Sequence, residues 1–135
     1  IDGRFDLLCL HMCLVMKRLK SKPELTRQYC QDLFDFMFLD MDQSLREMGV
    51  GDLSVGKRVK EMGKAFLGRL HVYETVIELK DAKLQEALIR NVYRGKTDFS
   101  EYAERLASYA RQIDKQLADT PIKSIMEGEF VLLWQ

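Results

Sequence analysis

A Gly-Val-Gly break at residues 49–51 separates two long stretches in which apolar residues recur every three or four positions. The first runs from Glu24 to Met48 and the second from Val55 to Ile77. This spacing places apolar side chains on one face of a helix, and glycine readily adopts the left-handed conformation that ends a helix. The sequence therefore predicts a tight reversal between two long helices, around which the rest of the chain packs.

The remaining chain shows the same helical periodicity and no convincing pattern of strands. A length of 135 residues fits one domain with a real core. We therefore predict an all-α, single-domain helical bundle of about five to six helices over residues 1–135. The expected further elements are helices around Phe5–Leu19, around Leu84–Val92 (closed by Gly95) and around Tyr102–Leu117, a short helix after Thr120-Pro121, and an extended apolar tail at 130–134 across the core.

Short polar residues and glycines predict how these helices begin and pack. Gly56 and Gly63 lie on the flank of the apolar stripe of the third helix, where each costs about 1 kcal/mol relative to alanine. Close contact with a neighbouring helix would compensate, so we expect it at both. The predicted helix-capping residues are Ser21, Asp52 or Ser54, Asp81, and Asp98. The predicted core residues of the third helix are Val59, Met62, Phe66 and Leu70.

The charge is balanced overall but divided locally. The 21 basic residues equal the 21 acidic ones, so net charge indicates neither a nucleic-acid-binding nor a membrane-surface protein. Between Asp32 and Asp52 there are six acids and one arginine, whereas between Leu53 and Leu70 there are five bases and one glutamate. The break at Gly49–Gly51 thus joins an acidic helix to a basic one.

This charge reversal has two interpretations. In the first, charges pair within the molecule and fix the angle between the two helices. In the second, the basic face receives an acidic protein or RNA, although a patch this small without interleaved aromatic residues is weak support for nucleic acid. The residues that could pair across the turn are Asp40, Asp42, Glu47 or Asp52 with Arg46, Lys57 or Arg58.

No pattern for catalysis, metal binding or a cofactor is present, so we predict no enzyme activity, no metal and no cofactor. Cys9, Cys13 and Cys30 lack CxxC spacing and favour a reducing compartment, and Cys9 and Cys13 fit two small buried thiols. His11 and His71 each lie in an apolar helical context typical of core or boundary residues. The longest apolar run, 7–16, is shorter than the ~20 residues that a membrane-spanning helix needs.

The segment Asp40–Leu70, DMDQSLREMGVGDLSVGKRVKEMGKAFLGRL, resembles the ubiquinol-cytochrome c chaperone family. The similarity extends more loosely to the helical run from Phe5 and to Asn91–Gly95. It implies an all-helical, non-enzymatic chaperone that binds newly made, unassembled cytochrome b and promotes assembly of the respiratory bc1 complex (complex III). It also implies a place peripheral to a membrane: in the bacterial cytoplasm at the inner membrane, or on the matrix side of the mitochondrial inner membrane. Mitochondrial members work with a small partner protein near the ribosome.

The resemblance and the charge pattern together give a predicted client-binding set. Its members surround the turn or belong to the methionine and aromatic stripe of the second helix, for which plain core packing is the alternative. Two other functions stay open: a ribosome- or RNA-binding module using the basic helix 57–69, Arg69 included, and an enzyme or haem carrier using His11 or His71. The predicted client-binding residues are Asp42, Arg46, Asp52, Lys57, Arg58, Lys60, Lys64, Phe34, Phe38 and Met41.

Overall fold

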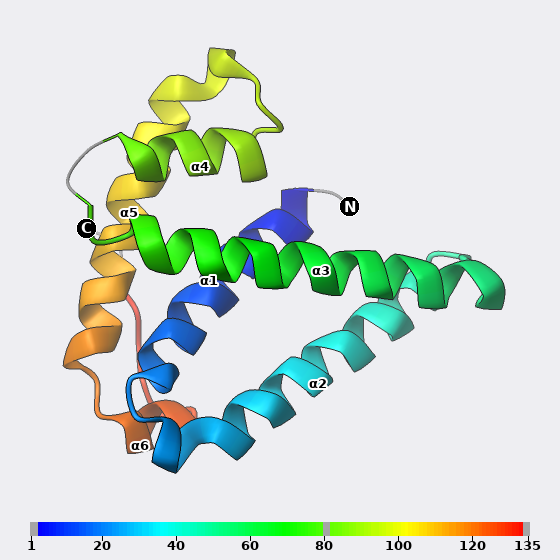
Figure 1. Cartoon of the computed structure of the whole chain (residues 1–135), viewed down its shortest axis with the longest axis horizontal. Coiled ribbons are helices and arrows are strands. Elements are labelled where there is room, and N and C mark those ends of the chain that lie inside the picture. Colours follow the sequence, from blue (N-terminus) through cyan, green and yellow to red (C-terminus); the bar gives the residue numbers. More distant parts are fainter. Residues whose placement is uncertain (1–2, 80–81, 134–135) are drawn as a thin grey trace.

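The computed structural model describes residues 3–79 and 82–133, apart from the side chain of Thr97, and over this range the chain forms helices and turns without strands (Figure 1). This confirms the all-α prediction, and each predicted helix is present. The elements are α1 Gly3–Lys20, α2 Pro23–Glu47, α3 Asp52–Val76, α4 Lys83–Asn91, the 3-10 helix η1 Thr97–Phe99, α5 Ser100–Asp119 and α6 Ile122–Met126.

The first helix, α1, is the centre of the structure. It contacts α2, α3 and α5, as its apolar residues on more than half of the circumference lead one to expect. Leu7 and Leu8 are the exceptions, since both remain about 40% exposed. The buried apolar residues of α1, each with less than a tenth of its surface exposed, are Phe5, Cys9, Leu10, Cys13, Leu14, Met16 and Leu19.

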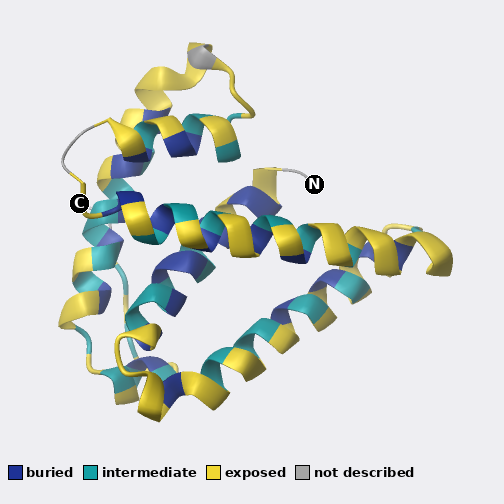
Figure 2. Ribbon diagram, viewed as in Figure 1, coloured by how far each residue is buried: buried dark blue, intermediate teal, exposed yellow. Residues whose placement is uncertain are grey.

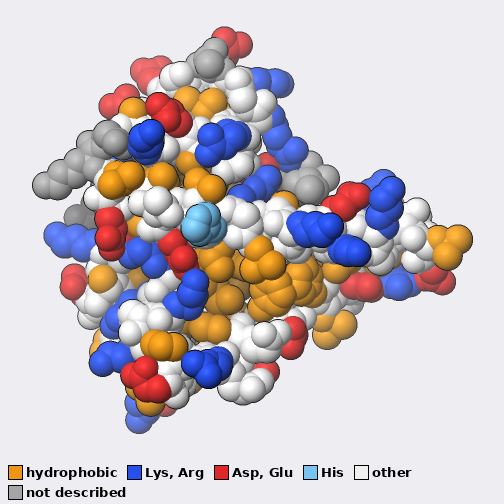
Figure 3. Space-filling model, viewed as in Figure 1, with side chains coloured by type: hydrophobic (Ala, Val, Ile, Leu, Met, Phe, Trp, Pro, Cys, Tyr) orange, Lys and Arg blue, Asp and Glu red, His pale blue; other side chains and the backbone are white. Residues whose placement is uncertain are grey.

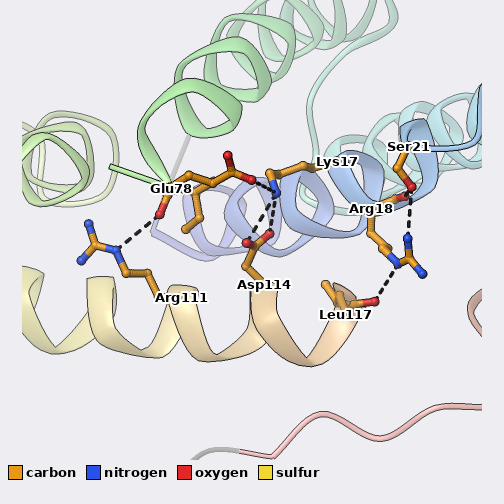
Figure 4. A network of polar contacts seen from close by, with 8 residues as sticks. Lys17, Arg18, Ser21, Glu78, Arg111, Asp114 and Leu117 are labelled. Carbon is orange, nitrogen blue, oxygen red and sulfur yellow. Dashed lines mark hydrogen bonds and ion pairs between the residues drawn. The ribbon is translucent and has the colours of Figure 1, made fainter. Parts of the chain in front are cut away.

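Polar contacts fix the C-terminal half of α1 against α5 (Figure 4). Lys17 Nζ lies 3.2 Å from the Asp114 carboxylate and 3.3 Å from that of Glu78. Arg18 donates hydrogen bonds to the carbonyls of Leu117 and Thr120, at 2.8 and 2.9 Å. Because the last carbonyls of a helix have no partner within it, Arg18 satisfies the C-terminal end of α5 and locks the two helices together.

A buried ion pair fixes the N-terminal half of α1. Asp6 is fully buried, and its carboxylate oxygens lie 2.6 Å from Arg69 of α3 and 2.9 Å from Arg94, which follows α4. The guanidinium of Arg69 also stands 5.6 Å above the centre of the Phe5 ring. A carboxylate without solvent needs such partners, so one side chain ties three parts of the fold together.

The two long helices α2 and α3 form an open arm whose tip lies far from α4 and α5 (Figure 1). Gly49 has φ +89°, and the amides of Gly49 and Val50 each donate a 3.0 Å bond, to the carbonyls of Arg46 and Leu45. This pattern satisfies the last carbonyls of α2 and confirms the predicted left-handed cap. Exposed residues dominate at the arm tip, whereas buried ones gather where α3 crosses α1 (Figure 2).

Gly63 and Gly56 have different roles, although the sequence predicted the same one for both. A Cβ atom on Gly63 would lie 2.4 Å from the tip of the Phe38 ring, so α2 and α3 approach as closely as they do only because Gly63 has no side chain. A Cβ on Gly56 would meet no described atom within 4 Å. The prediction is therefore confirmed for Gly63 and wrong for Gly56, which lies beyond the region where the two helices pack closely.

The predicted side-chain caps are wrong wherever the structure describes them. Lys22, Gly51 and Phe99 occupy the capping positions of α2, α3 and α5, and none makes a side-chain capping bond. Asp81 lies outside the described residues. Ser21 does not cap α2 because its hydroxyl donates to the Arg18 carbonyl. The other three residues lie inside a helix and not at its start: Asp52, which pairs with Arg46, and Ser54 lie in α3, and Asp98 lies in η1.

The core and tail predictions hold in most positions. Phe66 and Leu70 are buried, but Val59 and Met62 are only half-buried, and Met62 lines a cleft beside α1. In the tail, Phe130 and Leu132 pack against the core, and the Gln116 side chain accepts a 2.7 Å bond from the Leu133 amide. This confirms the extended tail over 130–133, while Trp134 lies outside the described residues.

The two glycines provide a matched test of the α2–α3 contact. Gly63→Ala should lower the free energy of unfolding by about 1–2 kcal/mol, because overpacking against Phe38 outweighs the gain in helix propensity. Gly56→Ala should raise it by up to ~1 kcal/mol, because the new methyl group meets nothing. Urea unfolding followed by circular dichroism measures both. Equal effects of the two substitutions would contradict the contact, as would an unchanged Gly63→Ala penalty in a Phe38→Ala background.

The buried ion pair gives a second test. Asp6→Ala should lower the free energy of unfolding by about 3–5 kcal/mol, since it leaves Arg69 without its partner in a nearly closed site. Glu78→Ala removes an ion pair on the other half of α1 whose carboxylate is mostly exposed, and should change stability by ~1 kcal/mol or less. A penalty for Asp6→Ala no larger than that for Glu78→Ala would show that the pair does not anchor α1.

Candidate functional site

A cleft of about 550 Å³ lies where the N-terminal end of α1 meets the C-terminal half of α2 and the N-terminal half of α3. Charged and polar groups from all three helices stand in its wall: Arg4, Asp40, Ser44, Arg58 and Glu61. The remaining lining is apolar and includes three methionines: Phe5, Leu8, Met41, Leu45, Met48 and Met62. The cleft thus combines an adaptable apolar surface with both signs of charge.

An ion pair positions one wall of this cleft. The Asp6–Arg69 pair holds the first turns of α1, with Phe5, against α3. Leu8 and Met48 then remain 41% and 71% exposed on the cleft wall, so their side chains are available to a partner. Burying an exposed leucine or methionine stabilises a complex by about 1.5–3 kcal/mol.

Arg46 joins the two walls at the turn. Its Nε donates to the Asp42 carboxylate at 2.7 Å, and its Nη1 pairs with Asp52 across the turn. These hydrogen bonds to Asp42 and Asp52 raise the pKa of Arg46 above its ordinary value. Intramolecular pairing is therefore confirmed for these three residues. Lys57 and Arg58, the alternatives to Arg46, have no ion pair within 4.0 Å among the residues described.

The predicted aromatic residues lie between α2 and α3. The Phe34 ring meets that of Phe38 edge-on at 4.3 Å between centroids and that of Phe66 at 5.6 Å. Phe38 also fills the space left by Gly63. Apolar side chains are visible along the junction of the two helices (Figure 3). Both phenylalanines therefore set the spacing of the arm, and a direct contact with a client stays a prediction for them.

The ten predicted site residues thus separate into four groups. Met41 and Arg58 line the cleft, and Phe34 and Phe38 pack within the arm. The other six divide between the turn, which holds Asp42, Arg46 and Asp52, and the exposed outer side of α3, which carries Lys57, Lys60 and Lys64.

Several cleft residues were missed by sequence reasoning. Arg4, Leu8, Ser44 and Glu61 belong to three helices whose contacts no local pattern reveals. Asp6 is the residue whose position could have indicated that α1 packs beside the arm. It is an acid three residues before Cys9 and therefore lies on the buried side of α1, where it needs a basic partner from another helix.

His11, Cys9 and Cys13 have structural surroundings, whereas His71 is exposed on α3, so the prediction of a core or boundary position is wrong for His71. His11 uses both ring nitrogens, at 2.7 Å from the Tyr109 hydroxyl and 2.8 Å from the Leu7 carbonyl. Burial raises the pKa of Cys9 to about 11 and also raises that of Cys13, which confirms them as buried thiols. The described chain has no group of three or more possible metal-binding side chains, and none of its helices is long and apolar enough to span a bilayer.

Comparison with known proteins identifies the family. The family model for ubiquinol-cytochrome C chaperone matches residues 1–134. The crystal structure of the Cbp3 homolog from Brucella abortus is similar, with a TM-score of 0.81 and 31% identity, over 96% of this chain and 72% of that chain.

Two curated relatives are ubiquinol-cytochrome c reductase complex assembly factor 1 of Xenopus laevis and of Mus musculus. The first is 26% identical over 98% of this chain and the second 28% identical over 96%. The chain spans 64% of the Xenopus protein's length and 42% of the mouse protein's. The family match over nearly the whole chain and the shared fold lead to one conclusion: this chain belongs to the ubiquinol-cytochrome C chaperone family.

Proposed function

We propose that this protein is a non-enzymatic assembly chaperone for the respiratory bc1 complex, and that it binds newly made cytochrome b in the cleft between α1, α2 and α3. The observation that carries the proposal is the family match over residues 1–134. The assembly-factor relatives support the bc1 complex as the destination. The cleft supports binding of an apolar partner, because its lining includes Phe5, Leu8 and Leu45 and three methionines.

The chemistry of the cleft suits an apolar segment of a membrane protein before that segment has its final neighbours. Met41, Met48 and Met62 are unbranched and polarizable, so they can fit side chains of different shapes. The charges of Arg58 and Glu61 at the wall would pair with polar groups that flank the apolar segment, which fixes its direction.

Five of the other predicted site residues have indirect roles in this proposal, and Lys57, Lys60 and Lys64, on the outer side of α3, have none. Asp42, Arg46 and Asp52 hold the two cleft walls at a fixed angle, and Phe34 and Phe38 set their spacing. A small partner protein, the ribosome and a location at the bacterial or mitochondrial inner membrane stay predictions from the family resemblance.

The alternatives receive less support. In an RNA-binding module the helix 57–69 would use Arg69, but Arg69 points inward to Asp6, which corrects that part of the prediction. A haem carrier would need a histidine with a free ring nitrogen, and His11 has both engaged. His71 is exposed on α3 and lies outside the cleft lining.

Exposed cleft residues provide the test. Met48→Glu and Leu8→Glu should each reduce recovery of cytochrome b about tenfold or more, because each places a charge where an apolar side chain would be buried. Leu25→Glu is the matched control: Leu25 is 64% exposed on α2, outside the cleft lining, and should bind as wild type. Cytochrome b is synthesised without its partner subunits in a cell-free system that contains detergent. The amount that each purified variant recovers in a pull-down is then measured.

Unchanged recovery with both cleft variants, their fold confirmed by circular dichroism, would overturn the cleft as the binding site. A photo-crosslinker placed at position 48 in cells separately tests the client. Cytochrome b should be recovered from position 48 and not from position 25, whereas recovery of only ribosomal proteins or RNA would overturn the chaperone assignment.

A further inference from the structure

The outer face of α3 carries a line of lysines between two exposed leucines. At 100° per residue its six members lie within an arc of about 80° and extend over about 27 Å of helix. Leu53 is 98% exposed and Leu67 53%, and the four residues between or beyond them are also exposed. We call this line the α3 stripe, and it consists of Leu53, Lys57, Lys60, Lys64, Leu67 and His71.

The positive charge of the stripe is uncompensated. The three lysines have no ion pair within 4.0 Å among the described residues, in contrast to Lys17 and Lys20 of α1. Nor does the arc contain a carboxylate: Glu61 lies about 80° from Leu53 around the helix and Asp52 about 100° in the other direction. Basic side chains are visible along α3, and an apolar side chain projects at the tip of the arm (Figure 3).

We propose that the α3 stripe docks on the surface of an anionic lipid bilayer, with α3 lying along the surface. Lysines reach lipid phosphates while leucines enter the boundary between headgroups and acyl chains. Charge complementarity selects an anionic surface, and the leucines at the two ends select a bilayer over other polyanions. An RNA backbone would engage the lysines and leave Leu53 and Leu67 in water, and the stripe has no Phe, Tyr or Trp on which a base could stack.

This inference goes beyond the proposed function and does not depend on it. The cleft residues Arg58 and Met62 lie about 140° and 180° from Leu53 around α3, so a bilayer on the stripe leaves the cleft open. The protein could then hold a client segment in the cleft while the outer side of the arm rests on the membrane from which that segment is taken or to which it is delivered.

Vesicle flotation tests the docking surface. Purified full-length chain is mixed with vesicles of phosphatidylcholine alone or with added phosphatidylglycerol. Wild type should float only with the anionic vesicles and should lose binding as salt is raised. The combined variant Lys57→Glu, Lys60→Glu and Lys64→Glu should lose flotation by more than tenfold.

Matched variants isolate each contribution. The combined variant Lys22→Glu, Lys96→Glu and Lys115→Glu makes the same charge change at exposed positions outside α3 and should float as wild type. Leu53→Ala with Leu67→Ala keeps every charge and should weaken flotation about tenfold, through the lost apolar insertion alone. Circular dichroism checks that each variant is folded.

Three results would overturn the proposal: flotation unaffected by the stripe charge reversal, equal loss in the control charge reversal, or full binding by the double leucine variant. Filter binding of single-stranded RNA by the same variants gives a fourth test. If the lysine charge reversal abolishes RNA binding while the double leucine variant binds both RNA and vesicles as wild type does, the stripe binds phosphate chains and not bilayers. Cytochrome b recovery in detergent is measured on the same variants and should be unchanged, so failure of the two proposals can be told apart.

Discussion

The buried carboxylate of Asp6 is the contact on which the arrangement of the other helices depends. It lies at the start of the most apolar helix, where an unpaired charge would strongly destabilise the fold. Arg69 and Arg94 reach it from α3 and from the turn after α4, and Arg94 adopts φ 57° there. One carboxylate thereby sets where three separate parts of the chain meet, with a directionality that apolar packing alone does not provide.

The open arm is a consequence of this anchoring. Since α1 is fixed against the inner half of α3 and against α5, it cannot fill the space between α2 and α3 toward their tip. The two long helices touch closely at Gly63 and Phe38 and are joined by the Gly49 turn, and between these points Met41, Leu45 and Val55 are buried. On the side that faces the start of α1, the cleft remains, and Met62 is half-buried because it lines that cleft.

Features that depend on residues close together in the sequence could be predicted from it, whereas contacts between distant segments could not. Helix periodicity and the left-handed Gly49 are local, and both are confirmed, as are the buried thiols of α1. Gly56 and Gly63 share one local pattern, and only the crossing point of α2 and α3 distinguishes them. Within the cleft, Met41 and Arg58 come from the segment that resembles the family, whereas Leu8 enters because α1 folds back against the arm.

The charge distribution shows why a chain with no net charge can still present distinct surfaces. On the acidic side of the turn, Arg46 pairs with both Asp42 and Asp52 at short range. On the basic side, Arg69 turns inward to Asp6, and the lysines of α3 are left unpaired on the outside. Screening confines such fields to about 8–10 Å, so the equal totals of acid and base do not cancel them. Because these lysines and the cleft lie on different sides of one rigid helix, an electrostatic contact and an apolar one can be made at the same time by separate partners.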